Sequence, residues 1–308
     1  MSRHLLEIDE LAAAEMREIL DLAGQEKPAQ VLAGRTVALL FEKPSARTRS
    51  SASVAVVQLG GHPVVITGPE VGLDVRETVE DVARTLACYH AAIGARVFEH
   101  SKLERVVAAL DASGCPVPVV NLLSDRGHPC QALADILTLR QHFGDLGGRT
   151  LAYVGDGNNV CRSLVFAAAL TGLPVCVATP PGYELDEADV KRARDLGGTV
   201  VVTTDPTEAV AAADAVYTDV WASMGQEDEA DRRRAAFAGF TVDERLMAQA
   251  RPDAVFLHCL PAHRGEEVSA EVVDGPRSLV WPQAANRMHS MRGLLLWLMA
   301  QEQAGAAR

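Results

Sequence analysis

The sequence lacks the features of membrane-spanning and nucleic-acid-binding proteins. No apolar run reaches the roughly 20 residues that a membrane-spanning helix needs. Lysine and arginine (29 residues) are outnumbered by aspartate and glutamate (41), and the formal charge of −12 disfavours nucleic acid or an anionic membrane as a partner. An anionic substrate would therefore need a local basic pocket.

The six cysteines include no C-x-x-C pair and lie far apart along the chain, mostly in apolar surroundings. We therefore expect buried, reduced thiols rather than a disulfide framework. These residues are Cys88, Cys115, Cys130, Cys161, Cys176 and Cys259.

The composition and length are those of a globular protein with two domains. Apolar residues make up 48% of the chain and charged residues 23%, and 308 residues suffice for two domains and a large buried core. Residues 1–10 become acidic too early for a signal or transit peptide. We therefore expect a cytoplasmic protein.

The most informative stretch is 41–49, with the sequence Phe-Glu-Lys-Pro-Ser-Ala-Arg-Thr-Arg. It follows a short apolar run, 35–41, that predicts a strand buried on both faces, and it precedes a helix predicted over 50–59. Such a turn directs the positive N-terminal end of a helix at one edge of the sheet, and the serine, threonine and arginines of this stretch add hydroxyl and guanidinium groups there. The pattern indicates a phosphate site, although an ordinary surface helix start with solvated arginines gives the same pattern.

Further strands and helices are expected in the first half of the chain. Apolar residues within 5–26 recur at near-helical spacing, and a helix is predicted from Glu10 onward with Asp9 as its cap. The other expected strands are 61–67, 92–98 and 115–121; a polar loop spans 68–74, and helices cover 78–89, 103–110 and the stretch through 133–139.

Three polar residues in this half are candidates for the same sheet edge. Arg96 interrupts an apolar strand, although its stem could equally extend past the edge of the sheet. Pro129 suits a first helical turn, which places His128 at the cap and Gln131 in that turn. A lone His-Pro pair is usually only a helix start.

A glycine-rich break at 144–148 is followed by a second series of alternating strands and helices. Alternation of this kind predicts a parallel sheet covered on both faces, whose ligands gather at the carboxyl ends of the strands. The expected strands are 150–154, 173–178, 199–203, 215–218, 254–258 and 279–280, and the expected helices are 159–171, 184–196, 206–213 and 243–250.

The predicted fold is α/β, with two doubly wound parallel-sheet domains joined by interdomain helices. We assign residues 1–143 to the first domain and 144–283 to the second. Residues 284–308 form a C-terminal helix that returns to the first domain. Two such halves suggest one site between them.

The glycine turn at 154–160 resembles a dinucleotide-binding loop only in part. It supplies G-x-G, but Val160 stands where the third glycine belongs, and no clear ribose-binding acid follows the next strand. The sequence therefore disfavours a nicotinamide or flavin dinucleotide.

Several motifs occur in the order found in one known family. They are Ser45-Ala46-Arg47-Thr48-Arg49, Arg96, His128-Pro129-Cys130-Gln131, Asp219-Val220-Trp221-Ala222-Ser223-Met224-Gly225, His258-Cys259-Leu260-Pro261 and Asn286-Arg287-Met288-His289. On these residues the chain resembles the aspartate and ornithine carbamoyltransferases, and within them the ornithine branch. These short motifs are spread over nearly the whole chain.

The resemblance implies an enzyme that transfers the carbamoyl group of carbamoyl phosphate to ornithine, without metal or organic cofactor. The implied carbamoyl-phosphate ligands are Ser45, Ala46, Arg47, Thr48, Arg96, His128, Pro129, Cys130, Gln131, Cys259, Leu260 and Arg287. The implied ornithine ligands are Asn159, Asp219, Ser223 and Met224. Arg96, His128, Asp219 and Cys259 are the residues implied in catalysis, and a homotrimer is implied with a residue of the loop 68–74 reaching a neighbour.

Some alternatives remain open. A sister carbamoyltransferase would use aspartate, putrescine or a modified ornithine, and a non-catalytic descendant would only bind phosphate or an amino acid. Cys259 could matter through its backbone rather than its sulfur. Three departures from the family pattern bear on affinity: Ala46 replaces a threonine, no glutamine lies near Gly72, and Ala285 stands where an acid is common.

Overall fold

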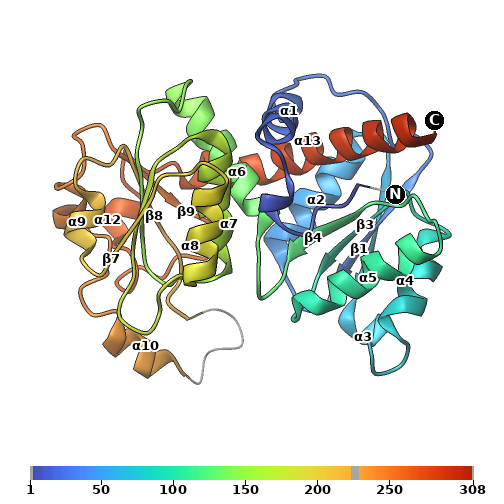
Figure 1. The fold of residues 1–308 in the computed structure, drawn as a ribbon, viewed down its shortest axis with the longest axis horizontal. Helices are drawn as coiled ribbons and strands as arrows, with labels where there is room; N and C mark the ends of the chain where they lie inside the picture. The colour runs from blue at the N-terminus through green and yellow to red at the C-terminus, as the bar shows by residue number, and fades with distance from the viewer. Residues whose placement is uncertain (1–2, 223–228, 307–308) are drawn as a thin grey trace. The chain divides into compact units, whose positions relative to one another are not determined.

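The computed structural model describes residues 3–222 and 229–306 (Figure 1). It divides into two compact units: Met1–Ala134 with Arg287–Arg308, and Asp135–Asn286. Both boundaries fall inside helices, in α6 (Pro129–Phe143) and in α13 (Val280–Ala306). The expected domain limits at 143/144 and 283/284 lie near these points and stay predictions.

The first unit contains a four-stranded parallel sheet in the order β2-β1-β3-β4. Its strands are β1 (Thr36–Phe41), β2 (His62–Thr67), β3 (Ala92–Arg96) and β4 (Val119–Leu123). The first strand of the chain lies inside the sheet, because β2 adds on one side of it and β3 on the other. The connections therefore diverge between β1 and β3, which is where such sheets bind ligands.

Helices cover both faces of this sheet, as expected of a doubly wound fold. α4 (Val79–Ala87) and α5 (His100–Ala112) pack on one face over Ala38, Leu40 and Ile93 (Figure 1). α2 (Ala46–Gln58) packs against β1 and β2. A short helix, α3 (Gly68–Val71), lies within the stretch that was expected to be only a loop.

The N-terminal prediction was wrong in its start. A 3₁₀ helix occupies Ile8–Glu10, and α1 begins only at Ala13 and ends at Ala23. Glu15 caps it, because its carboxylate accepts the N–H of Ala12 at 2.8 Å. The residues before it extend the sheet instead: Leu5 donates to the carbonyl of Val119 at 2.9 Å.

The C-terminal part of α13 belongs to the first unit, which confirms that the last helix packs back on the first domain. Gly293 lets it approach α1 closely: a Cβ there would lie 2.4 Å from the carbonyl oxygen of Ile19. Arg292 donates to the carbonyl of Ala23 at 2.8 Å, and Trp297 donates to Glu18 at 3.1 Å. A single helix thus closes the core of the first unit.

The second unit contains a five-stranded parallel sheet in the order β7-β6-β5-β8-β9. Its strands are β5 (Leu151–Val154), β6 (Val175–Ala178), β7 (Val200–Thr203), β8 (Ala215–Thr218) and β9 (Val255–His258). The connections diverge between β5 and β8. The fold class is therefore confirmed in both units.

Helices also cover both faces of the second sheet (Figure 1). α7 (Asn159–Thr171) and α8 (Glu187–Asp195) pack against each other on one face, and α9 (Pro206–Val210), α11 (Glu244–Met247) and α12 (Ala270–Val273) lie on the other. α10 (Ala230–Ala236) and α12 were not expected from the sequence. The predicted strand at 279–280 is wrong: α13 begins at Val280, and Ser278 makes only an isolated bridge to Phe256.

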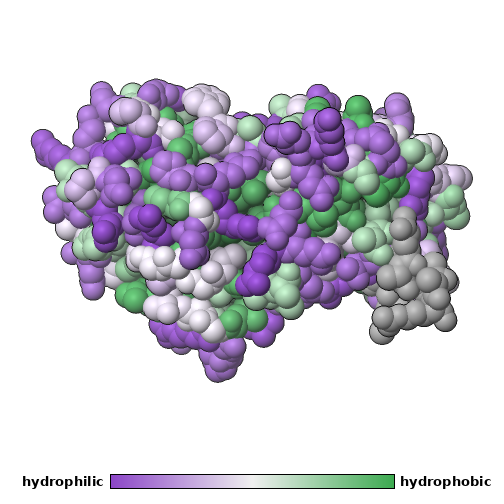
Figure 2. Space-filling model, turned by 90° about the horizontal axis from the view of Figure 1, so that it is seen from above, coloured by the Kyte–Doolittle hydropathy of each residue, from purple (hydrophilic) through white to green (hydrophobic). Residues whose placement is uncertain are grey.

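Within residues 3–222 and 229–306, no helix is long and apolar enough to cross a membrane. Figure 2 shows a face on which hydrophilic residues predominate, with apolar residues scattered among them. Larger hydrophobic side chains that are exposed include Val57 and Val75 in the first unit and Val202 in the second.

Candidate active site

The carboxyl ends of β1 and β3 lie side by side in the first unit. Phe41, at the end of β1, pairs in register with Arg96, at the end of β3. Arg96 is 6% exposed. Its guanidinium group is therefore held at the point where the connections of the sheet diverge.

The stretch after β1 forms the N-terminus of α2. Ser45 is the N-cap; its Oγ accepts the N–H of Thr48 at 3.3 Å and donates to Thr48 Oγ1 at 3.0 Å. The helix begins at Ala46, four residues earlier than the sequence predicted, because this serine supplies the cap. Ala46, Arg47 and Thr48 thus form its first turn, where backbone N–H groups without helical partners favour an anion.

A cluster of buried polar side chains lies at the start of α6. His128 precedes the helix and its carbonyl accepts the N–H of Gln131 at 2.9 Å. Arg287 of α13 donates through Nη1 to His128 Nε2 at 3.2 Å and to Gln131 Oε1. All three side chains are buried. The structure thus brings together the predicted residues His128 and Gln131 with the predicted residue Arg287, which lies 156 positions after Gln131 in the sequence.

His128 is neutral in this cluster. Burial lowers its pKa well below the usual value, and the charges of Arg287, Arg96 and Arg47 lower it further, in that order. Because Nε2 accepts from Arg287, the proton of the imidazole is on Nδ1.

The loop before α6 is fixed by Asn121 of β4. Its Nδ2 donates to the carbonyl of Leu6 at 2.9 Å and to Ser124 Oγ at 3.1 Å. The predicted ligands Pro129 and Cys130 follow in the first turn of α6; Cys130 donates through Sγ to the carbonyl of Asn121 at 3.4 Å. Burial raises the pKa of Cys130 to about 11, so its thiol stays protonated and packs in the core.

The second unit gathers predicted residues at the ends of β5, β8 and β9. Asp219 follows β8 and is 4% exposed. Its Oδ1 accepts from Cys259 Sγ at 3.0 Å, and its Oδ2 accepts from Asn158 Nδ2 at 3.0 Å. Asn158 also caps α7 through its Oδ1, so the same side chain fixes both the helix start and the carboxylate.

Cys259 is a hydrogen-bond donor here. Burial raises the pKa of its thiol well above the usual value, and the nearby charge of Asp219 raises it further. The thiol therefore stays protonated near neutral pH, which excludes a thiolate nucleophile at this position. Its sulfur orients Asp219.

The structure describes only some of the remaining predicted residues. Asn159 is the first residue of α7, next to the cap. Ser223 and Met224 lie outside the described residues. Cys259 and Leu260 belong to the second unit, and their predicted roles toward carbamoyl phosphate stay predictions.

Sequence reasoning missed Asn158 and His258 as site residues. Asn158 was read only as part of a glycine turn, and its cap position before α7 was the available signal. The motif at 258–261 indicates no role for the side chain of His258, yet its Nδ1 accepts the N–H of Leu260 at 2.9 Å.

Asp219, His258 and Cys259 each place one ligand-type atom within 4.8 Å of the others, a spacing that could hold a metal ion. These atoms already have partners: both nitrogens of His258 bond within the protein, and Cys259 bonds Asp219. A metal ion would have to replace these hydrogen bonds.

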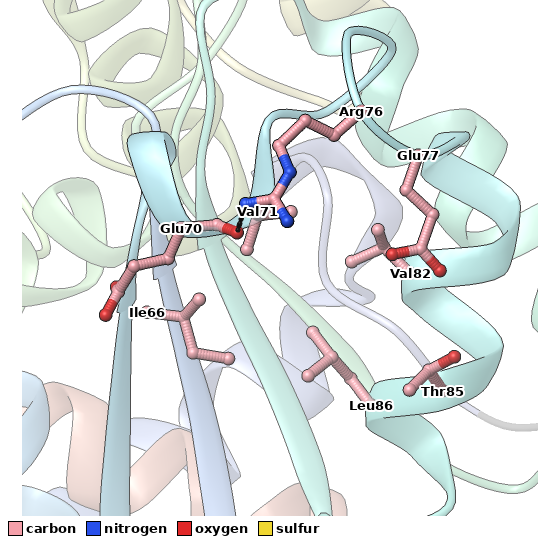
Figure 3. A pocket seen from close by; sticks show the side chains of 8 residues that line it. All are labelled: Ile66, Glu70, Val71, Arg76, Glu77, Val82, Thr85 and Leu86. Atoms are coloured by element: carbon pink, nitrogen blue, oxygen red, sulfur yellow. Dashed lines mark hydrogen bonds between the residues drawn. The ribbon is translucent and has the colours of Figure 1, made fainter.

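A pocket of about 290 Å³ lies elsewhere in the first unit, beside the edge strand β2 (Figure 3). Ile66, Val82 and Leu86 give it an apolar wall, and Arg76 extends across it to the carbonyl of Glu70 at 3.3 Å. Its lining is separate from the predicted site residues.

Both halves of the chain match models of one family. Residues 3–141 match the carbamoyl-P binding domain of aspartate/ornithine carbamoyltransferase, and residues 147–298 match its Asp/Orn binding domain. An ornithine carbamoyltransferase of Parafrankia sp. is 50% identical, with 99% of this chain and 98% of the relative covered.

Solved structures agree with this match. The ornithine carbamoyltransferase of Thermus thermophilus has a TM-score of 0.87 and 47% identity, covering 97% of this chain and 99% of that one. The enzyme of Pyrococcus furiosus has a TM-score of 0.91 and 45% identity, with 97% of each chain covered. A structure of N-acetyl-L-ornithine transcarbamylase is also similar, with a TM-score of 0.85, 32% identity, and 96% and 99% coverage. The chain therefore belongs to the aspartate/ornithine carbamoyltransferase family.

Proposed function

We propose that this protein is an ornithine carbamoyltransferase, which forms citrulline and phosphate from carbamoyl phosphate and L-ornithine. The contact that best supports this is the one from Arg287 to His128 and Gln131. It holds an imidazole that stays neutral under the charges of Arg287, Arg96 and Arg47, as an acyl phosphate, with its phosphate group and reactive carbonyl, requires.

Carbamoyl phosphate would place its phosphate at the start of α2. Backbone N–H groups of Ala46, Arg47 and Thr48 and the hydroxyls of Ser45 and Thr48 are the proposed donors. The Thr48 N–H and the Ser45 hydroxyl would exchange the hydrogen bonds between these two residues for bonds to the phosphate. The Arg47 guanidinium adds a charged fork. The threonine hydroxyl lost at Ala46 is absent from this set, but its backbone N–H remains.

The carbonyl oxygen of carbamoyl phosphate gains negative charge as the amine attacks. We assign Arg96 and the Nδ1–H of His128 to this oxygen, because a donor positioned there stabilises the transition state. A neutral His128 serves this role without competing for the proton of the amine. Gln131 would hold the carbamoyl amide, and Arg287 orients both His128 and Gln131.

Ornithine is proposed to bind at Asn159, Asp219, Ser223 and Met224. Its δ-amine, with an ordinary pKa near 10, must lose one proton before it attacks. The new C–N bond then forms, the C–O bond to phosphate breaks, and the proton released by the attacking nitrogen leaves with the phosphate. Asp219, oriented by Cys259 and Asn158, would hold the α-amino group.

Substitution of Arg47 tests the phosphate site. We expect Arg47→Ala to abolish citrulline formation and carbamoyl-phosphate binding, because the bidentate contact proposed for the phosphate is lost, and to leave the unfolding transition unchanged, because Arg47 is exposed. Arg49→Ala, two residues further along the same helix, is the matched control and should retain activity. Wild-type affinity of Arg47→Ala in calorimetric titration would contradict the assignment.

A panel of acceptors tests the substrate. Ornithine should far exceed N-acetylornithine, putrescine and aspartate in product formed with carbamoyl phosphate. N-acetylornithine is included because a structurally similar protein bears its name. Preference for another acceptor would identify a sister carbamoyltransferase, and no product from any acceptor would favour a binding protein.

We further propose a cytoplasmic homotrimer acting in arginine biosynthesis. The six cysteines are free, and the Pyrococcus relative is named an anabolic enzyme. Val57 of α2 and Val75, in the loop after α3, are both exposed and are suited to a subunit contact. Light scattering should report a trimer that Val57→Asp dissociates and that Val202→Asp, on the exposed strand β7, leaves intact. A fully active monomer would refute this assembly.

A further inference from the structure

The segment after β9 is tied to one buried carboxylate. Glu267 is 0% exposed, and its Oε1 lies 3.2 Å from Nε2 of His258, which is itself 1% exposed. The same Oε1 accepts the backbone N–H of His263. Glu267 therefore holds both ends of the loop that carries Cys259 and Leu260.

The other nitrogen of His258 fixes the backbone of this loop. Its Nδ1 accepts the N–H of Leu260 at 2.9 Å, and the N–H of His258 itself donates to Gln283 Oε1 at 2.9 Å. An imidazole nitrogen that accepts carries no proton, so the proton is on Nε2 and is donated to Glu267. Without that carboxylate the imidazole could carry its proton on Nδ1, and two donors would then face each other at Leu260.

The backbone at Leu260 needs this support. Its φ is 62°, in the left-handed region that residues with a Cβ rarely adopt. A residue held in such a conformation persists only where surrounding contacts impose it. Cys259, immediately before it, donates to Asp219, so a shift at Leu260 would also move the proposed ornithine ligand.

We propose that Glu267 is a positioning residue of the active site. It selects the Nε2–H tautomer of His258, which holds Leu260 and thereby keeps Cys259 against Asp219. This inference rests on the proposed function for its kinetic consequence, although its structural claim concerns the tautomer alone.

The kinetic test compares two substitutions at Glu267 with one at its neighbour. Glu267→Gln keeps an acceptor oxygen and should retain kcat/KM for ornithine within about fivefold, a loss below about 1 kcal/mol. Glu267→Leu removes the acceptor and should lower kcat/KM for ornithine by about 10- to 100-fold, as expected when a hydrogen bond to a buried charged group is lost. Glu266→Gln, whose carboxylate pairs with Arg234 at 3.5 Å, is the matched control and should match the wild type.

A merely structural role would give a different result. It would lower the unfolding temperature of Glu267→Leu and leave kcat and KM of the folded enzyme at 25 °C unchanged. That outcome, or equal impairment in Glu267→Gln and Glu267→Leu, would overturn the proposal.

The tautomer is tested independently of activity and of variant stability. Long-range ¹H–¹⁵N spectra of the wild-type protein with labelled histidine should show His258 as the Nε2–H tautomer, with the signal assigned by its absence in His258→Gln. An Nδ1–H tautomer would refute the inference even in a protein that forms citrulline. Failure of citrulline formation with the Nε2–H tautomer present would instead count against the proposed function.

Discussion

Removal of the Cys259 sulfur separates a side-chain role from a backbone role. Its Sγ donates a hydrogen bond to Oδ1 of Asp219, whose Oδ2 accepts another from Asn158, and each bond is 3.0 Å long. Cys259→Ala removes this donor from a carboxylate group whose residue is 4% exposed. A hydrogen bond to a charged group contributes about 1.5–3 kcal/mol, and each 1.4 kcal/mol is a factor of ten, so kcat/KM for ornithine should fall roughly 10- to 100-fold.

The assay is citrulline formation at saturating carbamoyl phosphate over a range of ornithine concentrations. Cys259→Ser keeps a donor in the same place and should lose less than about fivefold, which corresponds to under 1 kcal/mol. Cys176→Ala, a thiol on β6 of the same unit, is the control and should leave kcat/KM unchanged. Wild-type kcat/KM in Cys259→Ala would refute the reasoning and leave only the backbone of Cys259 as functional.

Three further results are expected. Gly293→Ala should lower the free energy of unfolding measured in urea. The new Cβ would lie 2.6 Å from the backbone of Ala23, and such overpacking costs about 1–3 kcal/mol or more, whereas the higher helix propensity of alanine contributes about 1 kcal/mol. An unchanged urea midpoint would refute the close approach of α13 to α1. The unfolding temperature should fall as the pH drops below about 6.5, because His128 then binds a proton in the unfolded chain but, with its lowered pKa, stays unprotonated in the folded state. His128→Asn should reduce this fall. An unaltered dependence of the unfolding temperature on pH would show that His128 is not the cause. Iodoacetamide at pH 8 should label exposed Cys88 well before buried Cys130, whose pKa is raised to about 11, as measured by mass spectrometry; early labelling of Cys130 would contradict its burial.

Much of the fold could be predicted from local pattern. Apolar runs of five or six residues alternating with amphipathic stretches predicted parallel strands and covering helices, because each pattern permits few other packed arrangements. The prediction failed where the apolar run was only two residues long, at 279–280, and where a capping side chain, Ser45, started a helix earlier than expected. The helix after β1 began at Ala46 rather than Ser50 because Ser45 caps it, and the stretch at 279–280 joined α13 rather than the sheet.

The sequence alone determined the residue types of the candidate site. Ordered motifs with hydroxyls, guanidinium groups and an imidazole at predicted strand ends indicated phosphate and carbonyl chemistry. No spacing in the sequence predicted which of these groups would touch. Only the tertiary structure placed Arg287 on His128 and Gln131, some 156 residues away in the chain.

The ionisation states and hydrogen-bond directions were also decided by the tertiary structure. The neutral state of His128 requires burial next to positive charges, and the protonated thiol of Cys259 requires burial next to Asp219. The role of Glu267 depends on a hydrogen bond to a histidine nine residues away, through a nitrogen whose proton is set by Leu260 on the opposite side of the ring. Sequence specifies which groups are present, but pKa and tautomer depend on distance, burial and the direction of neighbouring dipoles, which exist only once the chain is folded.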